Sequence, residues 1–168
     1  MLILGIDPGT ARTGVGIVSI KTKTPKFVYS DVIITHQDLE MPKRLRLLYK
    51  TLSAVIKEYA PDIMVVERLF FNTNVKTAIA VGQARGIALL SAADKNLPVF
   101  EYTALQAKLA LTGYGRSSKK EVQEAVKDIL KLDIQVKSDD ANDAVAMALC
   151  FIRKDLEQYL DPSKIIIK

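Results

Sequence analysis

"LILGIDPGT", residues 2–10, is the stretch that decides the fold. Apolar residues around Gly5 lead directly into Asp7, and the Pro8-Gly9 pair then starts a turn. This pattern predicts a buried strand that ends in a carboxylate. A buried carboxylate is unfavourable unless it is paired, hydrogen-bonded or bound to a metal. The role of Asp7 therefore depends on whether other acidic side chains lie close to it in the folded protein.

Composition places the chain among soluble globular proteins. Its 168 residues, 49% hydrophobic and 26% charged, predict one domain over residues 1–160 and a loose tail at 161–168. The longest clean apolar run, residues 144–152, is far shorter than the ~18 residues of a membrane span, so we expect no membrane partner. Cys150 cannot form an internal disulfide and no secretory leader is visible, which favours a reducing, cytoplasmic compartment. The net charge of +5 and the pI of about 9.2 are consistent with a polyanionic partner.

The pattern of apolar residues predicts an α/β fold with a mixed five-stranded sheet flanked by helices. Gly14 and Gly16 fall on one face of the second strand and indicate a close approach, either by another element or by a ligand. The predicted strands are 2–6, 13–20, 27–35, 62–70 and 98–103, and the predicted helices are 42–59, 74–95, 104–111, 119–131 and 139–159.

Acids occur at further strand and helix ends. Glu67 follows the apolar run "IMVV", and Asp140 and Asp143 lie three residues apart on one face of the last predicted helix. Each has a simpler explanation by itself: turn chemistry at Asp7, a strand end at Glu67, and helix capping near Asp140. In α/β sheets, however, strand ends and helix N-termini are where functional groups converge.

Four carboxylates in one place would repel one another unless cations lie among them. Oxygen ligands suit Mg²⁺ or Mn²⁺, and the lone His36 and Cys150 provide no zinc site. Two such ions ~4 Å apart would support an in-line displacement at phosphorus. The sequence therefore predicts a site for two divalent metal ions.

The segments "GIDPGT", "VVERLFF", "GQARG", "PVFEYT", "GYGRSSKKEVQ" and "DDANDAVAMAL" follow one another in an order that resembles the RuvC family of Holliday-junction resolvases. This resemblance implies a ribonuclease H-like fold, with metal-binding acids at Asp7, Glu67, Asp140 and Asp143. Asp139 is an alternative to Asp140 for the third metal-binding acid, and only the DxxDA pattern selects Asp140. The resemblance also implies a homodimer that nicks two strands of a four-way DNA junction symmetrically, in recombination and repair, together with a branch-migration helicase.

Basic residues supply candidate DNA contacts. The loop "GYGRSSKK" carries Arg116, Lys119 and Lys120 among glycines, a composition that can approach phosphates closely. The resemblance places functional lysines at Lys119, as a further catalytic residue, and at Lys108, while Lys120 leaves the loop assignment open by one position. A solvated loop before a helix is the simpler explanation.

Two further features have open interpretations. Phe70 and Phe71 are adjacent, and one of them could stack on an unpaired base beside the acids; the resemblance favours Phe70. The predicted helix 74–95 carries small residues, which indicate either packing on the sheet or a twofold interface.

Three other functions compete with the resolvase. "GIDPGT" also resembles the first phosphate loop of the actin and Hsp70 kind of ATP-binding protein, but a second lobe and a second glycine-rich loop are missing from these 168 residues. A non-catalytic junction-binding protein is a second alternative, which the presence of all four acids disfavours. The third is a small ribonuclease H-like enzyme that acts on RNA.

Overall fold

The computed structural model describes residues 1–21, 24–68, 75–161 and 163, with the backbone alone at 75–77. Phe70, Phe71 and most of the expected tail lie outside the described residues. The described elements are, in chain order, β1 (Leu2–Asp7), β2 (Arg12–Ile20), β3 (Pro25–Ile34), α1 (Met41–Tyr59), β4 (Ile63–Glu67), α2 (Val75–Ala93), β5 (Val99–Tyr102), α3 (Ala104–Thr112), α4 (Lys119–Leu130), α5 (Asp139–Lys154) and α6 (Leu156–Leu160).

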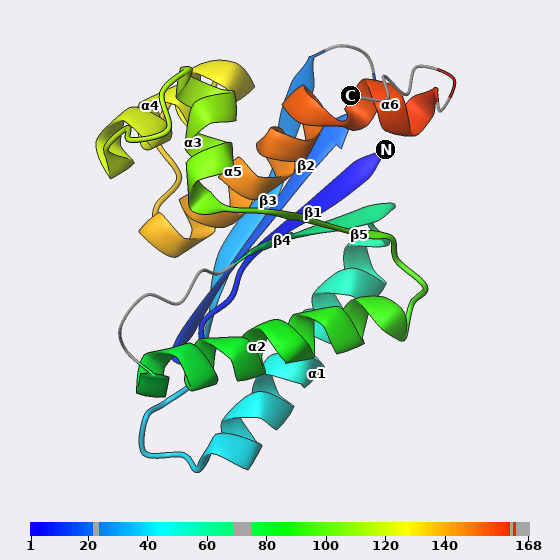
Figure 1. The fold of residues 1–168 in the computed structure, drawn as a ribbon. Coiled ribbons are helices and arrows are strands. Elements are labelled where there is room, and N and C mark those ends of the chain that lie inside the picture. The colour runs from blue at the N-terminus through cyan, green and yellow to red at the C-terminus, as the bar shows by residue number, and fades with distance from the viewer. Residues whose placement is uncertain (22–23, 69–74, 162, 164–168) are drawn as a thin grey trace.

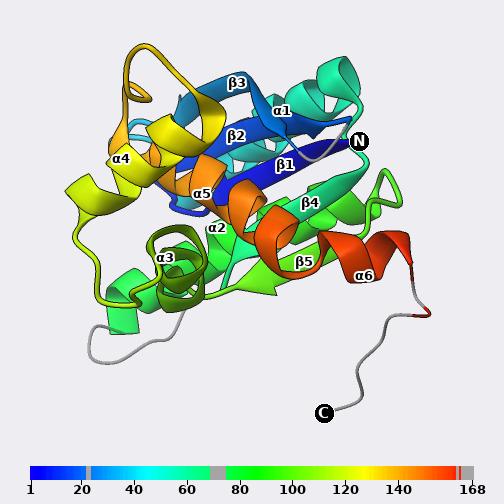
Figure 2. The same ribbon diagram turned by 90° about the horizontal axis from the view of Figure 1, so that it is seen from above.

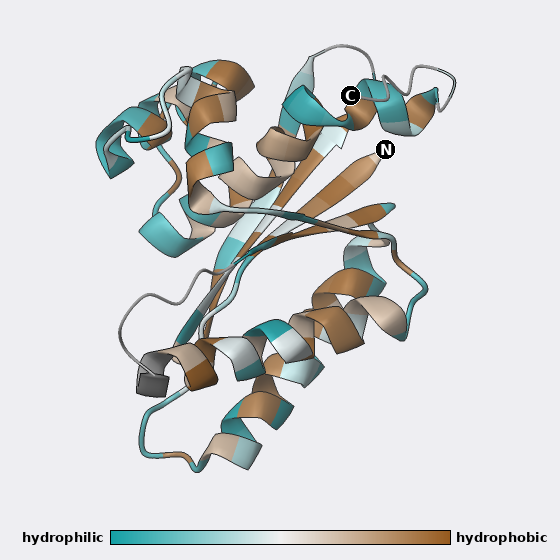
Figure 3. Ribbon diagram, in the orientation of Figure 1, coloured by the Kyte–Doolittle hydropathy of each residue, from teal (hydrophilic) through white to brown (hydrophobic). Residues whose placement is uncertain are grey.

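The strands form one mixed sheet in the order β3-β2-β1-β4-β5, which confirms the expected five-stranded sheet. β1 pairs antiparallel with β2 and parallel with β4, and β5 continues the parallel part. Helices α1 and α2 cover one face of this sheet, and α3, α4 and α5 cover the other (Figures 1 and 2). The sheet is therefore the middle layer, and its strands are predominantly apolar (Figure 3).

Strand alternation decides which face each side chain reaches. On β1, Leu4 and Ile6 belong to the core under α1 and α2, whereas Ile3 belongs to the core under α5. Since successive strand residues point to opposite faces, Asp7 shares the face of Ile3. Glu67 follows Ile63 and Val65 on β4 by the same rule. Both carboxylates thus lie on the face that α5 covers.

Helix α5 lies directly on glycines of the sheet. A Cβ atom at Gly14 would come within 1.9 Å of the carbonyl oxygen of Asp140, and one at Gly5 within 1.9 Å of that of Ala144. A Cβ at Gly16 would meet Val145 at 2.6 Å. The close approach predicted for Gly14 and Gly16 is therefore made by a helix, and it sets the height of α5 above the strands.

The outer helices are amphipathic, as expected for helices with one face in the core. α1 buries Leu48, Leu52, Val55 and Ile56, and it ends at Ala60, which has a left-handed conformation before Pro61. α5 differs because every residue from Ala144 to Phe151 is buried, between the sheet on one side and α3 and α4 on the other. No helix in the described part of the chain has the length and apolar character to cross a membrane.

Two predicted elements end earlier than expected. The expected helix 139–159 is interrupted at Asp155, whose backbone is non-helical and whose carboxylate accepts a hydrogen bond from the Tyr102 hydroxyl. The expected strand 62–70 ends at Glu67, after which the amide of Arg68 still donates to the Tyr102 carbonyl at 2.7 Å. The end of β4 therefore leaves Glu67 at the edge of the sheet.

Candidate active site

Asp7 and Glu67 form the centre of the site. Ile6 pairs with Val66 in the parallel ladder, so the next residue of each strand emerges at the same edge of the sheet. The two carboxyl side chains are joined by a hydrogen bond. Burial raises the pKa of Asp7 to about 8, and the negative charges of Glu67 and Asp143 add to this rise. Burial also raises the pKa of Glu67. Burial and the neighbouring negative charges therefore both favour the protonated form of Asp7.

Asp143 approaches this pair from the first turns of α5, whose position is set by the glycines of β1 and β2. Burial raises its pKa, the positive charge of Lys119 opposes this rise, and Asp139 and Asp140 add to it. Asp143 in turn raises the pKa values of both Asp7 and Glu67. Three of the four predicted acids therefore interact electrostatically in one place.

Asp140 lies nearby but has a different partner. Its Oδ2 atom accepts a hydrogen bond from Nε of Arg12 at 2.6 Å, across the start of β2. Its charge contributes to the raised pKa of Asp7, whereas Asp139 makes no such contribution. Asp139 instead contacts Gln123 and Lys119 of α4, at 2.8 Å and 3.6 Å. This arrangement supports the choice of Asp140 over Asp139.

The donor chemistry of these four acids suits a hard divalent cation, because every available donor is a carboxylate oxygen and the negative charges help to raise the pKa values of Asp7, Glu67 and Asp143. Among the described residues, no three acidic, His or Cys side chains already surround one point as metal ligands.

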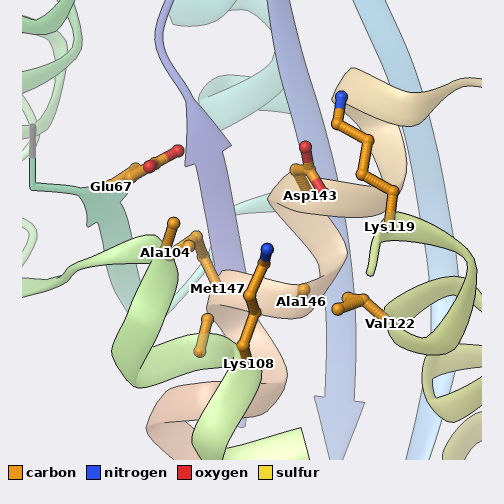
Figure 4. A pocket seen from close by; sticks show the side chains of 9 residues that line it. Glu67, Ala104, Lys108, Lys119, Val122, Asp143, Ala146 and Met147 are labelled. Atoms are coloured by element: carbon orange, nitrogen blue, oxygen red, sulfur yellow. The ribbon is translucent and has the colours of Figure 1, made fainter. Parts of the chain in front are cut away.

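A pocket of about 160 Å³ lies beside the acids. Glu67 of β4, Lys108 of α3, Lys119 of α4 and Asp143 of α5 supply its charged lining (Figure 4). Ala104, Ala107, Val122, Ala146 and Met147 complete the lining. The pocket is therefore lined by charged groups of both signs and by apolar side chains.

Lys119 begins α4, and the preceding loop fixes it there. Ser118 caps the helix in a reciprocal capping box with Glu121. Ser117 is buried, and its hydroxyl lies 2.8 Å from that of Thr112. Internal hydrogen bonds therefore hold this loop in place, although Tyr114 and Arg116 are exposed.

The other basic candidates lie farther from the acids. Lys120 and Arg116 are exposed and do not line the pocket, while Lys108 and Lys119 do. Lys119 also opposes the rise in the pKa of Glu67. The structure therefore favours Lys119 over Lys120 as the lysine next to the acids.

Sequence reasoning missed the contacts of three arginines. Arg12 was part of the turn "DPGTAR", and nothing in its spacing indicated a partner at Asp140. Arg85 of "GQARG" hydrogen-bonds Glu101 of "PVFEYT", and Arg68 lies 3.4 Å from the same carboxylate. The segments "GQARG" of α2 and "PVFEYT" of β5 therefore meet in the structure, beside Arg68.

Comparison with known proteins identifies relatives over most of the chain. A family model described as crossover junction endodeoxyribonuclease RuvC matches residues 3–151. The protein of that name from Desulforamulus reducens is 50% identical over 150 residues, which cover 89% of this chain and 92% of the relative. Its counterpart from Syntrophomonas wolfei is 45% identical over 164 residues, covering 97% and 95%.

The same relationship appears in three dimensions. The structure of Thermus thermophilus RuvC in complex with Holliday junction substrate superposes with a TM-score of 0.86 at 30% identity, over 91% of this chain and 93% of that one. The ribonuclease H-like fold expected from the sequence is therefore confirmed.

Proposed function

Because the chain belongs to the RuvC family of crossover junction endodeoxyribonucleases, we propose that it binds four-way DNA junctions and nicks two of their strands symmetrically, in recombination and repair. The observation that carries this proposal is the half-buried Asp7–Glu67 pair at neighbouring strand ends, with Asp143 beside it. The matches reported above give no support to an ATP-binding lobe or to a non-catalytic junction-binding protein.

Nucleases of this family generally need a divalent metal ion. In this chain Asp7, Glu67, Asp140 and Asp143 would hold two ions, Mg²⁺ or Mn²⁺. When bound, these ions supply activation of the attacking water and stabilisation of the leaving oxygen. The raised pKa of Asp7 supports the assignment, since a carboxyl that keeps its proton in the absence of metal has a strong unmet demand for positive charge.

Lys119 and Lys108 would act on the scissile phosphate itself. Both line the pocket beside Glu67 and Asp143, so their ammonium groups can face the negative charge that develops during cleavage. Apolar side chains that include Met147 line the same pocket.

More distant residues would hold the DNA arms. Arg116 is exposed in the loop before α4 and Lys120 is exposed in its first turn, where they can contact phosphates without touching the acids. Phe70, proposed to stack on an unpaired base, lies outside the described residues and stays a prediction.

A homodimer would supply two matched sites for a twofold junction. Gly82 and Gly86 of α2 are exposed, and an added Cβ at either would meet nothing within 4 Å. Ile79 and Leu90 are also exposed on this helix, whereas Ala84 and Ala88 face the sheet. Gly82 and Gly86 are therefore not used for packing on the sheet, which supports a helix-to-helix contact with a second copy. Cooperation with a branch-migration helicase and a cytoplasmic location remain parts of the proposal.

The test compares a four-way junction with a linear duplex of the same sequence, each with Mg²⁺ and with EDTA. Paired nicks in the junction alone, and only with Mg²⁺, are the expected result. Asp7→Asn should abolish nicking while the protein still shifts the junction in a gel run with Ca²⁺, because the basic residues that contact phosphates are unchanged. Normal nicking by a folded Asp7→Asn protein, or full activity in EDTA, would contradict the proposal.

A further inference from the structure

Arg12 forms a closed hydrogen-bonded group with Asp140 and Ser138. Its Nε donates to Oδ2 of Asp140 at 2.6 Å, and its Nη2 donates to the Ser138 hydroxyl at 3.2 Å. That hydroxyl lies 3.5 Å from the same Oδ2 atom. One guanidinium therefore engages both the carboxylate and the residue that begins its helix.

The hydrogen bonds of Ser138 to Arg12 and Asp140 replace the helix-capping bond that a serine at this position usually makes. Ser138 is the N-cap of α5, where a serine side chain usually accepts a hydrogen bond from the first turn of the helix. Here its side chain makes no cap hydrogen bond. In α4 the corresponding Ser118 does cap its helix. The hydroxyl at the start of α5 is used for Arg12 and Asp140 instead.

Arg12 is also fixed from its own side. It is the first residue of β2, and Thr13 next to it is buried and donates its hydroxyl to the Gly9 carbonyl at 2.6 Å. The side chain of Arg12 is still 49% exposed, compared with 29% for Asp140. The guanidinium can therefore move into solvent while the backbone that carries it stays in place.

We propose that Arg12 is a positioning residue that serves as a built-in counter-ion for Asp140 and must release this carboxylate before Asp140 can hold a divalent metal. This inference rests on the proposed function, since it takes Asp140 as a metal ligand. Arg12 neutralises one of the four acids in the metal-free protein. It also occupies the Oδ2 atom and adds a positive charge close to the place where a second cation would bind.

The ion pair between Arg12 and Asp140 therefore makes the protein bind a divalent metal ion less tightly than it would without Arg12. Removing Arg12 restores a full negative charge to Asp140, so the metal-free protein becomes less stable and the metal binds more tightly. An ion pair this exposed has a modest strength, so the gain in affinity should be a few-fold, up to about 5-fold. A residue that merely held α5 in place would instead weaken metal binding when removed.

The experiment titrates Mn²⁺ alone into the full chain, without DNA, by calorimetry, and records melting temperatures with and without the metal. Arg12→Ala should bind Mn²⁺ up to about 5-fold more tightly than the wild type, melt lower without metal and gain more on metal addition. Arg12→Lys, which keeps the charge but loses the forked contact, should lie between the two. Arg46→Ala removes the same charge from an exposed position of α1 and should leave the affinity unchanged.

The outcomes separate this inference from the function on which it rests. Equal or weaker Mn²⁺ binding by Arg12→Ala, with binding lost in Asp7→Asn, would overturn the role of Arg12 alone. Undiminished binding by Asp7→Asn would overturn the metal site of the proposed function. A wild type that binds no Mn²⁺ would overturn both.

Discussion

Gly14→Ala tests whether the contact between α5 and β2 sets the geometry of the site. The added Cβ would lie 1.9 Å from the carbonyl oxygen of Asp140 and 2.4 Å from its carbonyl carbon. Both atoms belong to the backbone, so rotation of a side chain cannot relieve the overlap. To restore an ordinary contact of 3.4 Å, the helix must move about 1.5 Å farther from the strand.

This displacement acts on the acids directly, because Asp140 itself carries the obstructing carbonyl and Asp143 lies one turn along α5. A misplacement of ~1 Å in a reacting group can lower turnover by ~10²-fold, so cleavage by Gly14→Ala should fall by about that factor or more. Overpacking of this kind also destabilises by ~1–3 kcal/mol. For a chain of this length that loss corresponds to a fall of roughly 2–12 °C in melting temperature.

Single-turnover cleavage of a four-way junction, junction binding in Ca²⁺ and thermal melting by circular dichroism measure the three effects separately. Glu58→Ala is the control, because Glu58 is exposed near the end of α1, which covers the sheet face opposite α5, and alanine favours a helix. Cleavage and melting like the wild type in Gly14→Ala would show that α5 is not held at its height by this glycine.

Three further predictions follow from charge and exposure. In EDTA the melting temperature should fall as pH rises from about 4 to about 8, because the raised pKa of Asp7 means that folding favours its protonated form. Asp7→Asn should flatten this pH dependence. An equally steep dependence in the variant would show that Asp7 is not the group that titrates. Lys119→Ala should reduce turnover more than it reduces junction binding. Lys120→Ala should do the reverse, and the slope of log K for junction binding against log salt concentration should become shallower by ~0.9. Wild-type turnover and wild-type salt slope in both variants would exclude the loop from the site. Light scattering should give a mass of about 37 kDa, twice the 18.6 kDa of one chain, and Gly82→Arg should shift the protein toward monomer, whereas an unchanged dimer would place the interface elsewhere.

The central pair of acids could be predicted from local rules. The alternation of apolar residues before Asp7 and Glu67 places each on a definite face of its strand, and a parallel pairing brings both ends to one edge. The three-residue spacing of Asp140 and Asp143 similarly predicts a shared helical face. Such periodic signals depend only on neighbours in sequence, which is why they were sufficient here.

Contacts between distant side chains had no such signal. The pairing of Arg12 with Asp140 spans 128 positions and depends on where α5 rests on the sheet. The interruption at Asp155 likewise results from a hydrogen bond to Tyr102 of β5 rather than from a Gly or Pro. The apolar residues that flank Asp155 continue the helical pattern, so the boundary could not be seen in the sequence.

The dependence of the site on α5 also has a consequence for the timing of synthesis. The antiparallel strands β1, β2 and β3 are made first, and their contacts are local enough to form early. Glu67 joins Asp7 only after the crossover through α1, and Asp140 and Asp143 arrive when most of the 168 residues have been made. A chain emerging from the ribosome therefore has two of its four acids long before the others. The last long helix to be translated completes the proposed nuclease site, so an incomplete chain carries only part of the four acids.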